Sequence, residues 1–187
     1  MTAIDPVYYH YFQTLKKSPF KSEIATDTAS RIVYATDNSI YRCDPEGIVK
    51  PKTIEEVLYA IQLANTAPFK TISWTGRGGG TGTNGQSLTR GAMIDFQVFM
   101  NNVLEINQEE QWVRVQPGVS LKELNDQLKP VGFRFGPSLS PGNRATLGGM
   151  INTDACGIGS CRYGRTGEHV LGLKVILANG TLLDTES

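Results

Sequence analysis

Residues 76–85 read Gly-Arg-Gly-Gly-Gly-Thr-Gly-Thr-Asn-Gly. Glycine has no side chain, so consecutive main-chain N–H groups in such a segment can converge on an anion at a distance that side chains would prevent. A β-rich run at residues 70–74 comes just before it, which predicts a turn at the carboxyl end of a strand. Arg77 adds a positive charge beside the glycines. The pattern favours a phosphate-binding loop, with a merely flexible surface turn as the alternative.

This loop differs from the two most common phosphate-binding motifs. A Walker A loop ends in Gly-Lys-Ser/Thr, whereas Gly85 is followed by Gln86 and Ser87, so no lysine can reach a terminal phosphate. A Rossmann Gly-x-Gly-x-x-Gly pattern that starts at Gly78 would need glycine where the chain has Thr83. Nucleoside triphosphate hydrolysis and nicotinamide-dinucleotide binding are therefore disfavoured.

Composition narrows the class of protein. The chain has 187 residues, of which 40% are hydrophobic and 19% charged, enough for a globular domain with a substantial core. Its formal net charge is zero and it has no basic run, which argues against nucleic acid as a partner. No apolar stretch is long enough to cross a bilayer, and residues 1–10 lack the layout of a secretory signal. We therefore expect a cytoplasmic protein, with a peripheral position at the inner membrane left open for a longer parent protein.

Cysteine and histidine offer no metal site. Cys43, Cys156 and Cys161 form no Cys-x-x-Cys pair, so neither a zinc site nor an iron-sulfur site follows from their spacing. We interpret them as free thiols. The two histidines, His10 and His169, are too isolated to suggest a metal centre.

The elements predicted along the chain indicate an α+β fold. Residues 1–45 are expected to form a helical arm and residues 46–187 a ligand-binding domain. The latter begins with a strand at residues 48–49, a helix opened by Thr53-x-x-Glu56 and a strand before the glycines, which together form a small parallel βαβ piece. The later elements are expected to build a mixed, largely antiparallel sheet: strands at residues 92–95, 112–115 and 171–177, a capped helix opened by Ser120-x-x-Glu123, and a hairpin turn at Asn179-Gly180.

Residues 134–150 have no periodicity and many turn-forming residues, so we expect a long irregular segment, which in a compact domain is usually functional. Small and polar residues continue through residues 146–157, as in the first glycine loop. Each segment could hold one phosphate. Two such segments suit a ligand with a diphosphate at its centre, and such a ligand is a dinucleotide.

Four ordered motifs carry a family resemblance: residues 77–81 (Arg-Gly-Gly-Gly-Thr), 115–119 (Val-Gln-Pro-Gly-Val), 145–149 (Ala-Thr-Leu-Gly-Gly) and 163–164 (Tyr-Gly). Together they resemble the FAD-binding (PCMH-type) domain of the vanillyl-alcohol oxidase type flavoproteins, from about Gly47 to the end of the chain. Residues 36–41, 81–86 and 143–154 are similar to the bacterial branch that joins a flavin domain to an iron-sulfur domain, the D-2-hydroxyglutarate dehydrogenases. D-lactate and glycolate dehydrogenases resemble it more distantly.

The resemblance implies a set of cofactor contacts. Main-chain N–H groups of the first loop would hold the FAD diphosphate, residues 137–140 would run beside the flavin and its ribityl chain, and the segment from residue 146 onward would line the other side. The implied cofactor-binding residues are Arg77, Gly78, Gly79, Gly80, Thr81, Gly82, Gly85, Pro137, Ser138, Ser140, Thr146, Gly148, Gly149, Asn152, Thr153, Gly157, Tyr163 and Gly164. Ser138 stands where relatives carry aspartate. Thr81 stands where some relatives carry the histidine that attaches the flavin, so the resemblance implies noncovalent FAD.

The implied activity is oxidation of a 2-hydroxy acid by hydride transfer to the flavin. No catalytic residue is expected in this stretch, because the substrate arginines, the histidine base and the iron-sulfur cysteines of the family would lie beyond residue 187. We expect the stretch by itself to be inactive, and incomplete as a flavin domain. Arg144 and Arg162 are the local candidates for contact with a substrate anion, with pairing inside the fold as the alternative. Two other functions stay open: a noncatalytic nucleotide-binding or regulatory module, and a relative that acts on UDP-sugar precursors or aromatic alcohols.

Overall fold

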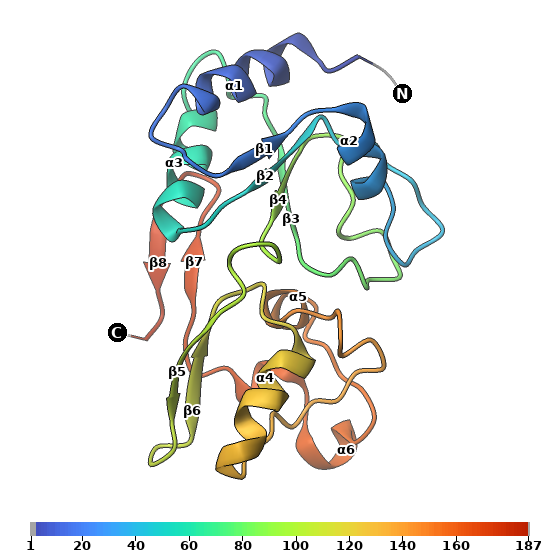
Figure 1. Ribbon diagram of the computed structural model, residues 1–187, viewed down its shortest axis with the longest axis vertical. Helices are drawn as coiled ribbons and strands as arrows, with labels where there is room; N and C mark the ends of the chain where they lie inside the picture. The colour runs from blue at the N-terminus through green and yellow to red at the C-terminus, as the bar shows by residue number, and fades with distance from the viewer. Residues whose placement is uncertain (1–2, 187) are drawn as a thin grey trace. The chain divides into compact units, whose positions relative to one another are not determined.

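The computed structural model describes residues 3–186 (Figure 1). The chain forms two compact units. The first unit consists of residues 3–77, 82–95 and 172–186, and the second of residues 78–81 and 96–171. The first unit contains α1 (Pro6–Lys16), β1 (Glu23–Ala25), α2 (Thr28–Tyr34), β2 (Gly47–Lys50), α3 (Ile54–Ala64), β3 (Trp74–Arg77), β4 (Ala92–Asp95), β7 (Lys174–Ile176) and β8 (Leu182–Asp184).

The first unit is built on a mixed sheet with the strand order β1-β2-β4-β3. β2 and β3 both run parallel to β4, while β1 is antiparallel to β2. All four residues of β4 are buried, as expected for the central strand of a sheet covered on both faces. The predicted parallel β-helix-β piece is confirmed, but β4 lies between its two strands.

α3 connects β2 to β3 and shows how the sequence determines this unit. Thr53 Oγ1 accepts the N–H of Glu56 at 3.3 Å, so the helix begins where the capping pattern predicts. The helix ends at Ala64, before Pro68, and turns at residues 66–72 follow it. β3 therefore begins only at Trp74, later than the strand predicted at residues 70–74. The residues just before it form turns, as their hydrogen bonds show.

The amino-terminal region contributes to the same core. Tyr11 and Phe12 of α1 are fully buried, and the Tyr11 hydroxyl donates to the Ala60 carbonyl of α3 at 2.7 Å. β1, which the sequence did not predict, pairs with β2 through three residues. The boundary drawn at residue 45 between arm and domain stays a prediction.

The predicted hairpin at the carboxyl end is confirmed as β7 and β8, which pair antiparallel. Gly180 in its turn has φ +79°, a conformation that residues other than glycine rarely adopt. Two side chains at the carboxyl end of α3 hold this turn. Asn65 Nδ2 donates to the Ala178 carbonyl at 2.8 Å, and Gln62 Nε2 donates to the Gly180 carbonyl at 3.0 Å.

The second unit combines an antiparallel pair of strands with short helices. Its elements are β5 (Val103–Asn107), β6 (Trp112–Val115), α4 (Leu121–Leu128), η1 (Lys129–Val131), α5 (Leu147–Asn152), α6 (Ser160–Tyr163) and η2 (Thr166–His169). The predicted capping box is present: Ser120 Oγ accepts the Glu123 N–H at 3.2 Å, and the Glu123 carboxylate accepts the Ser120 N–H at 3.0 Å. One hydrophobic core joins α4, α5 and the strand pair, and its buried members are Val119, Leu121, Leu124, Leu128, Ala145, Leu147 and Met150.

The irregular segment is shorter than predicted. Residues 134–146 are irregular or turn-forming apart from one isolated bridge at Thr146, but α5 begins at Leu147, inside the range expected to lack regular structure. Thr146 caps this helix, and Leu147 and Met150, three residues apart, bury their side chains in the core. Tertiary packing therefore stabilises a helix in a stretch that contains two glycines and has little helical propensity of its own.

Candidate functional site: a glycine loop with unpaired main-chain donors

Two of the glycines that follow β3 are required for close packing inside the second unit. A β-carbon on Gly78 would lie 2.0 Å from Thr146 Oγ1, and one on Gly79 would lie 1.9 Å from the Arg144 carbonyl oxygen. Both distances are far shorter than any van der Waals contact. Gly78 and Gly79 of the first glycine-rich segment (residues 76–85) therefore lie against Thr146, where the second such segment (residues 146–157) begins, and against Arg144 just before it.

The main-chain N–H groups of this loop are the feature that a ligand could use. Across residues 3–186, no protein acceptor takes the N–H groups of Gly79, Gly80 or Thr81. Gly79 is buried, Gly80 and Thr81 are half-buried, and Gly80 has φ +62°. An unpaired main-chain donor that is buried is costly, so the Gly79 N–H in particular indicates a missing acceptor. Consecutive amides without a cationic side chain are a donor set that suits a phosphate or diphosphate.

The second glycine-rich segment is different, since its amides are already used. Leu147 N–H donates to the Val119 carbonyl at 2.8 Å, and Gly148 N–H donates to the Pro117 carbonyl at 2.9 Å. Gly149 N–H reaches Thr146 Oγ1 at 3.4 Å. Gly148 is also explained by packing, because a β-carbon there would lie 2.8 Å from Pro117 Cβ. This segment supports the loop at residues 78–81, and cofactor contacts from Gly148 and Gly149 stay predictions.

The side chains of Asn152 and Thr153 turn back onto the same helix. Asn152 Nδ2 donates to the Gly148 carbonyl at 2.7 Å, and Thr153 Oγ1 donates to the Gly149 carbonyl at 3.0 Å. Both residues are exposed. They satisfy helix carbonyls in the structure, and their contact with a cofactor stays a prediction.

The segment at residues 137–140 lies against the loop that follows α5. A β-carbon on Gly157 would lie 1.8 Å from the Ser138 carbonyl oxygen, so only glycine permits this approach. Pro137 is fully buried, Ser138 is half-buried and Ser140 is exposed. The structure thus brings Ser138 and Gly157 together, and cofactor contacts from Pro137, Ser138, Ser140 and Gly157 stay predictions.

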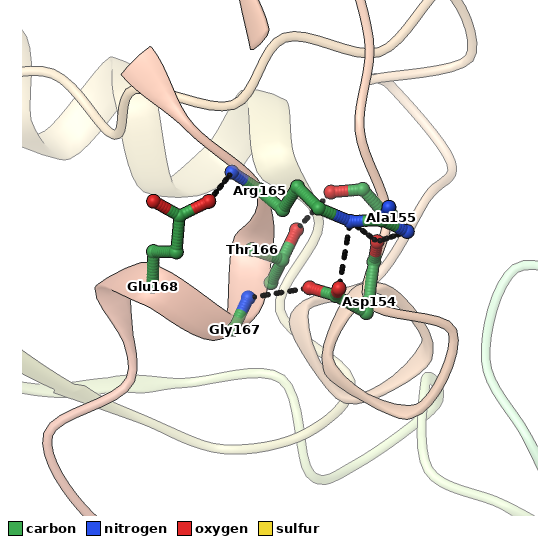
Figure 2. A network of polar contacts seen from close by, with 6 residues as sticks. All are labelled: Asp154, Ala155, Arg165, Thr166, Gly167 and Glu168. Carbon is green, nitrogen blue, oxygen red and sulfur yellow. Dashed lines mark hydrogen bonds and ion pairs between the residues drawn. The ribbon is translucent and has the colours of Figure 1, made fainter.

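A network of polar contacts closes the loop that carries Tyr163 and Gly164 (Figure 2). The Asp154 carboxylate accepts Arg165 Nε at 2.7 Å and the Gly167 N–H at 2.9 Å. Thr166, which is fully buried, donates its hydroxyl to the Ala155 carbonyl at 2.7 Å. The two ends of residues 156–164 are therefore held side by side.

Inside this loop, Gly164 and Tyr163 have distinct environments. Gly164 has φ +76°, and a β-carbon there would lie 2.7 Å from a Glu168 carboxylate oxygen. Tyr163 is 46% exposed as a residue, and the Arg162 guanidinium lies 5.4 Å from the centre of its ring. The exposed ring is available to a ligand, whereas Gly164 is required by the turn. Contact of Arg162 with a substrate anion stays a prediction.

The remaining predicted residues belong to the first unit. Arg77 is 9% exposed, and its guanidinium donates to the carbonyls of Tyr34 at 3.3 Å and Thr36 at 2.8 Å. Its side chain is thus used inside the fold, at the carboxyl end of α2, where positive charge is favourable. Gly85 has φ +74° and packs against the ring of Tyr41. A β-carbon on Gly82 would contact the side-chain amide of Gln86, the flexible end of a side chain.

Tyr34 and Asp95 are the residues of this region that the sequence did not indicate. The Tyr34 hydroxyl donates to a carboxylate oxygen of Asp95, which is 4% exposed. Burial, together with this bond and the charge of Asp95, raises the pKa of Tyr34 well above its usual value. The only available signal was an acidic residue directly after the apolar run at residues 92–94, at the carboxyl end of a strand.

Comparison with known proteins decides the family. The model of a family described as "FAD binding domain" matches residues 45–186. This chain belongs to that FAD-binding domain family. The D-2-hydroxyglutarate dehydrogenase of Pantoea ananatis is 51% identical over 175 residues, which are 94% of this chain and 17% of that protein. A probable mitochondrial D-lactate dehydrogenase of Danio rerio is 36% identical over 165 residues, 87% of this chain and 32% of that protein. This chain therefore spans well under half of the length of either relative.

A solved structure supports the fold of the FAD-binding domain. The structure of an alkyldihydroxyacetonephosphate synthase superposes with a TM-score of 0.83 over 95% of this chain and 35% of that one, at 24% identity. This likeness concerns the fold alone. The predicted α+β, PCMH-type class is confirmed, and in the part of the chain that the structure describes no helix is long and apolar enough to cross a membrane.

The residues of the loop fit the cofactor that the family implies. FAD carries a diphosphate between its two halves, and the unpaired N–H groups of Gly79, Gly80 and Thr81 are donors of the kind that bind such an anion. The loop has no residue that would oppose a negative charge: it contains three glycines and a threonine. The fit concerns the donor set, and the individual contacts remain predictions.

Proposed function

We propose that this FAD-binding domain belongs to a flavin-dependent dehydrogenase of 2-hydroxy acids, with D-2-hydroxyglutarate as the substrate and D-lactate or glycolate as the nearest alternatives. The observation that carries the proposal is the row of unpaired main-chain donors at Gly79, Gly80 and Thr81. The 51% identity to a protein named D-2-hydroxyglutarate dehydrogenase supports the choice of substrate.

In this proposal the chain itself binds and orients the cofactor. Main-chain amides of residues 79–81 neutralise the diphosphate without a lysine, because oriented peptide dipoles act as fixed partial positive charges. The chemistry supplied by bound FAD is acceptance of a hydride from the carbon that bears the substrate hydroxyl. We assign no catalytic side chain within residues 3–186, and any iron-sulfur ligands would come from outside the described residues.

We further propose that the cofactor is bound without a covalent bond. Thr81 follows the glycine triplet, and a threonine hydroxyl is not the group that attaches flavin in the relatives that do so covalently. Acid precipitation of the purified yellow protein tests this directly. We expect the flavin colour to stay in the supernatant, and colour that precipitates with the polypeptide would contradict noncovalent binding.

Flavin reduction tests the substrate. Anaerobic addition of D-2-hydroxyglutarate to the FAD-loaded full-length protein that contains this domain should bleach the visible flavin absorption, while the L enantiomer serves as the matched control. D-lactate and glycolate are added in parallel to rank the alternatives. A protein that takes up no FAD would contradict the cofactor assignment, whereas a flavoprotein bleached by none of these acids would contradict the substrate assignment alone. The 187 residues by themselves are expected to bleach with none of them.

A further inference from the structure

Arg144 contacts the glycine loop twice. Its guanidinium Nη2 donates to the Gly79 carbonyl at 3.0 Å, and its own carbonyl oxygen lies against the Gly79 α-carbon, where a β-carbon would be only 1.9 Å away. Both residues belong to the second unit. Arg144 therefore contacts Gly79 through both its main chain and its side chain.

The bond to the Gly79 carbonyl determines the direction of the next amide. The peptide bond between Gly79 and Gly80 is trans, so its C=O and N–H groups point in opposite directions within one plane. When the guanidinium of Arg144 holds the carbonyl, the N–H of Gly80 must point away from Arg144. That N–H is one of the donors that no acceptor among residues 3–186 takes.

Arg144 is an exposed residue, but its main chain is held firmly, which fixes the point from which the guanidinium reaches Gly79. The N–H groups of Arg144 and Ala145 both donate to the Pro141 carbonyl at 2.8 Å, and the Ala145 carbonyl accepts the N–H of Leu121 at the start of α4 at 2.9 Å. Ala145 is buried in the core of the unit. The main chain that carries the guanidinium is thus attached to the hydrophobic core through Ala145, while glycine at positions 78–80 leaves the loop few constraints of its own.

We infer that Arg144 is a positioning residue for the diphosphate loop: its guanidinium locks the Gly79–Gly80 peptide so that the Gly80 N–H is presented to the cofactor. This inference rests on the proposed FAD binding and assigns Arg144 a role different from contact with a substrate anion. A loop that is already ordered in the free protein binds its ligand more tightly, because binding then costs less conformational entropy of the loop.

The test is a titration of the full-length apoprotein that contains this domain with FAD, followed by flavin fluorescence, for the wild type and three variants. Arg144→Gln removes the bond to Gly79, and we expect roughly tenfold weaker FAD binding, the effect of one lost charge-assisted hydrogen bond. Arg144→Lys can still donate one bond to the carbonyl and should bind nearly as the wild type does. Arg134→Gln, at an exposed arginine of the same unit, is the matched control and should leave FAD affinity unchanged.

Salt dependence separates positioning from direct phosphate contact. If the guanidinium sits on a carbonyl, the slope of log Kd against log salt concentration should fall in Arg144→Gln by clearly less than the roughly one unit expected for a lost phosphate contact. A slope smaller by about one unit in the variant, or an unchanged Kd, would overturn the inference. If Arg144→Gln does not fold, Arg144→Lys carries the test, and tenfold weaker binding by that variant would overturn it. A wild type that binds no FAD would instead refute the proposed function.

Discussion

Thr146 Oγ1 occupies the space that a β-carbon on Gly78 would need, 2.0 Å from the ideal position of that atom. The same oxygen accepts the N–H of Gly149 at 3.4 Å, at the first turn of α5. One hydroxyl thus caps a helix and sets how closely the glycine loop can approach it. The loop that carries the unpaired donors is therefore coupled to α5 through a single side chain.

This coupling predicts the outcome of a double-mutant cycle. Gly78→Ala should destabilise the protein because its methyl group overlaps Thr146, and Thr146→Ala should cost about 1 kcal/mol for the lost helix cap. In the double variant the overlap with the hydroxyl is gone, so we expect it to be about 1 kcal/mol or more stable than the sum of the single effects predicts. Urea denaturation measures all four proteins, and strictly additive effects would show that the contact is not made.

Arg77 is expected to matter for the fold through its side chain. Arg77→Met removes the donors that hold the carbonyls of Tyr34 and Thr36, and the loss should be about 2–4 kcal/mol of unfolding free energy. Arg77→Lys should rescue only part of this, since an ammonium lacks the planar fork that spans two carbonyls. Arg90→Met, at an exposed position of the same unit, is the control for loss of charge. Equal losses from Arg77→Met and Arg90→Met in chemical denaturation would refute this role.

Asp154 should control the opening of the loop at residues 156–164. Asp154→Ala removes the acceptor of the Gly167 N–H and places alanine at φ +43°, whereas Asp154→Asn keeps an acceptor and a residue that tolerates this conformation. Amide hydrogen exchange should therefore accelerate at Gly167 and along the loop in Asp154→Ala, and much less in Asp154→Asn.

Asp126→Ala provides the comparison for that experiment. Asp126 forms an ion pair with Lys122 on the exposed surface of α4, where such a pair contributes little. Its loss should leave exchange at residues 156–164 unchanged. Protection of Gly167 that survives in Asp154→Ala would show that the network in Figure 2 does not hold the loop.

Glu56 predicts a pH dependence of stability. Its burial opposes ionisation, but hydrogen bonds from the Ser22 hydroxyl and from the N–H groups of Lys52 and Lys21 outweigh this and lower the pKa of Glu56. Because the folded pKa lies below the unfolded one, the stabilisation is present above the unfolded value, about 4.3, and is lost as pH falls through the folded value. The stability difference between the wild type and Glu56→Gln should therefore be constant at neutral pH and shrink below about pH 5, as followed by urea denaturation. A difference that grows as the pH falls would contradict the sign.

The sequence predicted an element correctly where its caps or turn involve only residues that are neighbours in the chain. Thr53 and Ser120 cap the helices at the predicted positions, and the turn at Asn179-Gly180 forms the predicted hairpin, because caps and turns need only neighbours in sequence. β1 and α5 were missed for the opposite reason. β1 exists through its pairing with β2, and α5 through burial of Leu147 and Met150 in a core assembled from distant segments.

The glycine loop shows the same division between sequence and structure. The run of glycines by itself predicted a turn after a strand whose main-chain donors are open to an anion, because no other residue lets such donors approach a ligand so closely. Only the tertiary structure decided which amides are available: those of Gly148 and Gly149 are already used, while among residues 3–186 those of Gly79, Gly80 and Thr81 meet no acceptor. It also decided that Arg77 and Arg144 hold carbonyls of the protein. The type of a residue determines which hydrogen bonds it is able to make. Its actual partner depends on segments that come together only when the chain has folded.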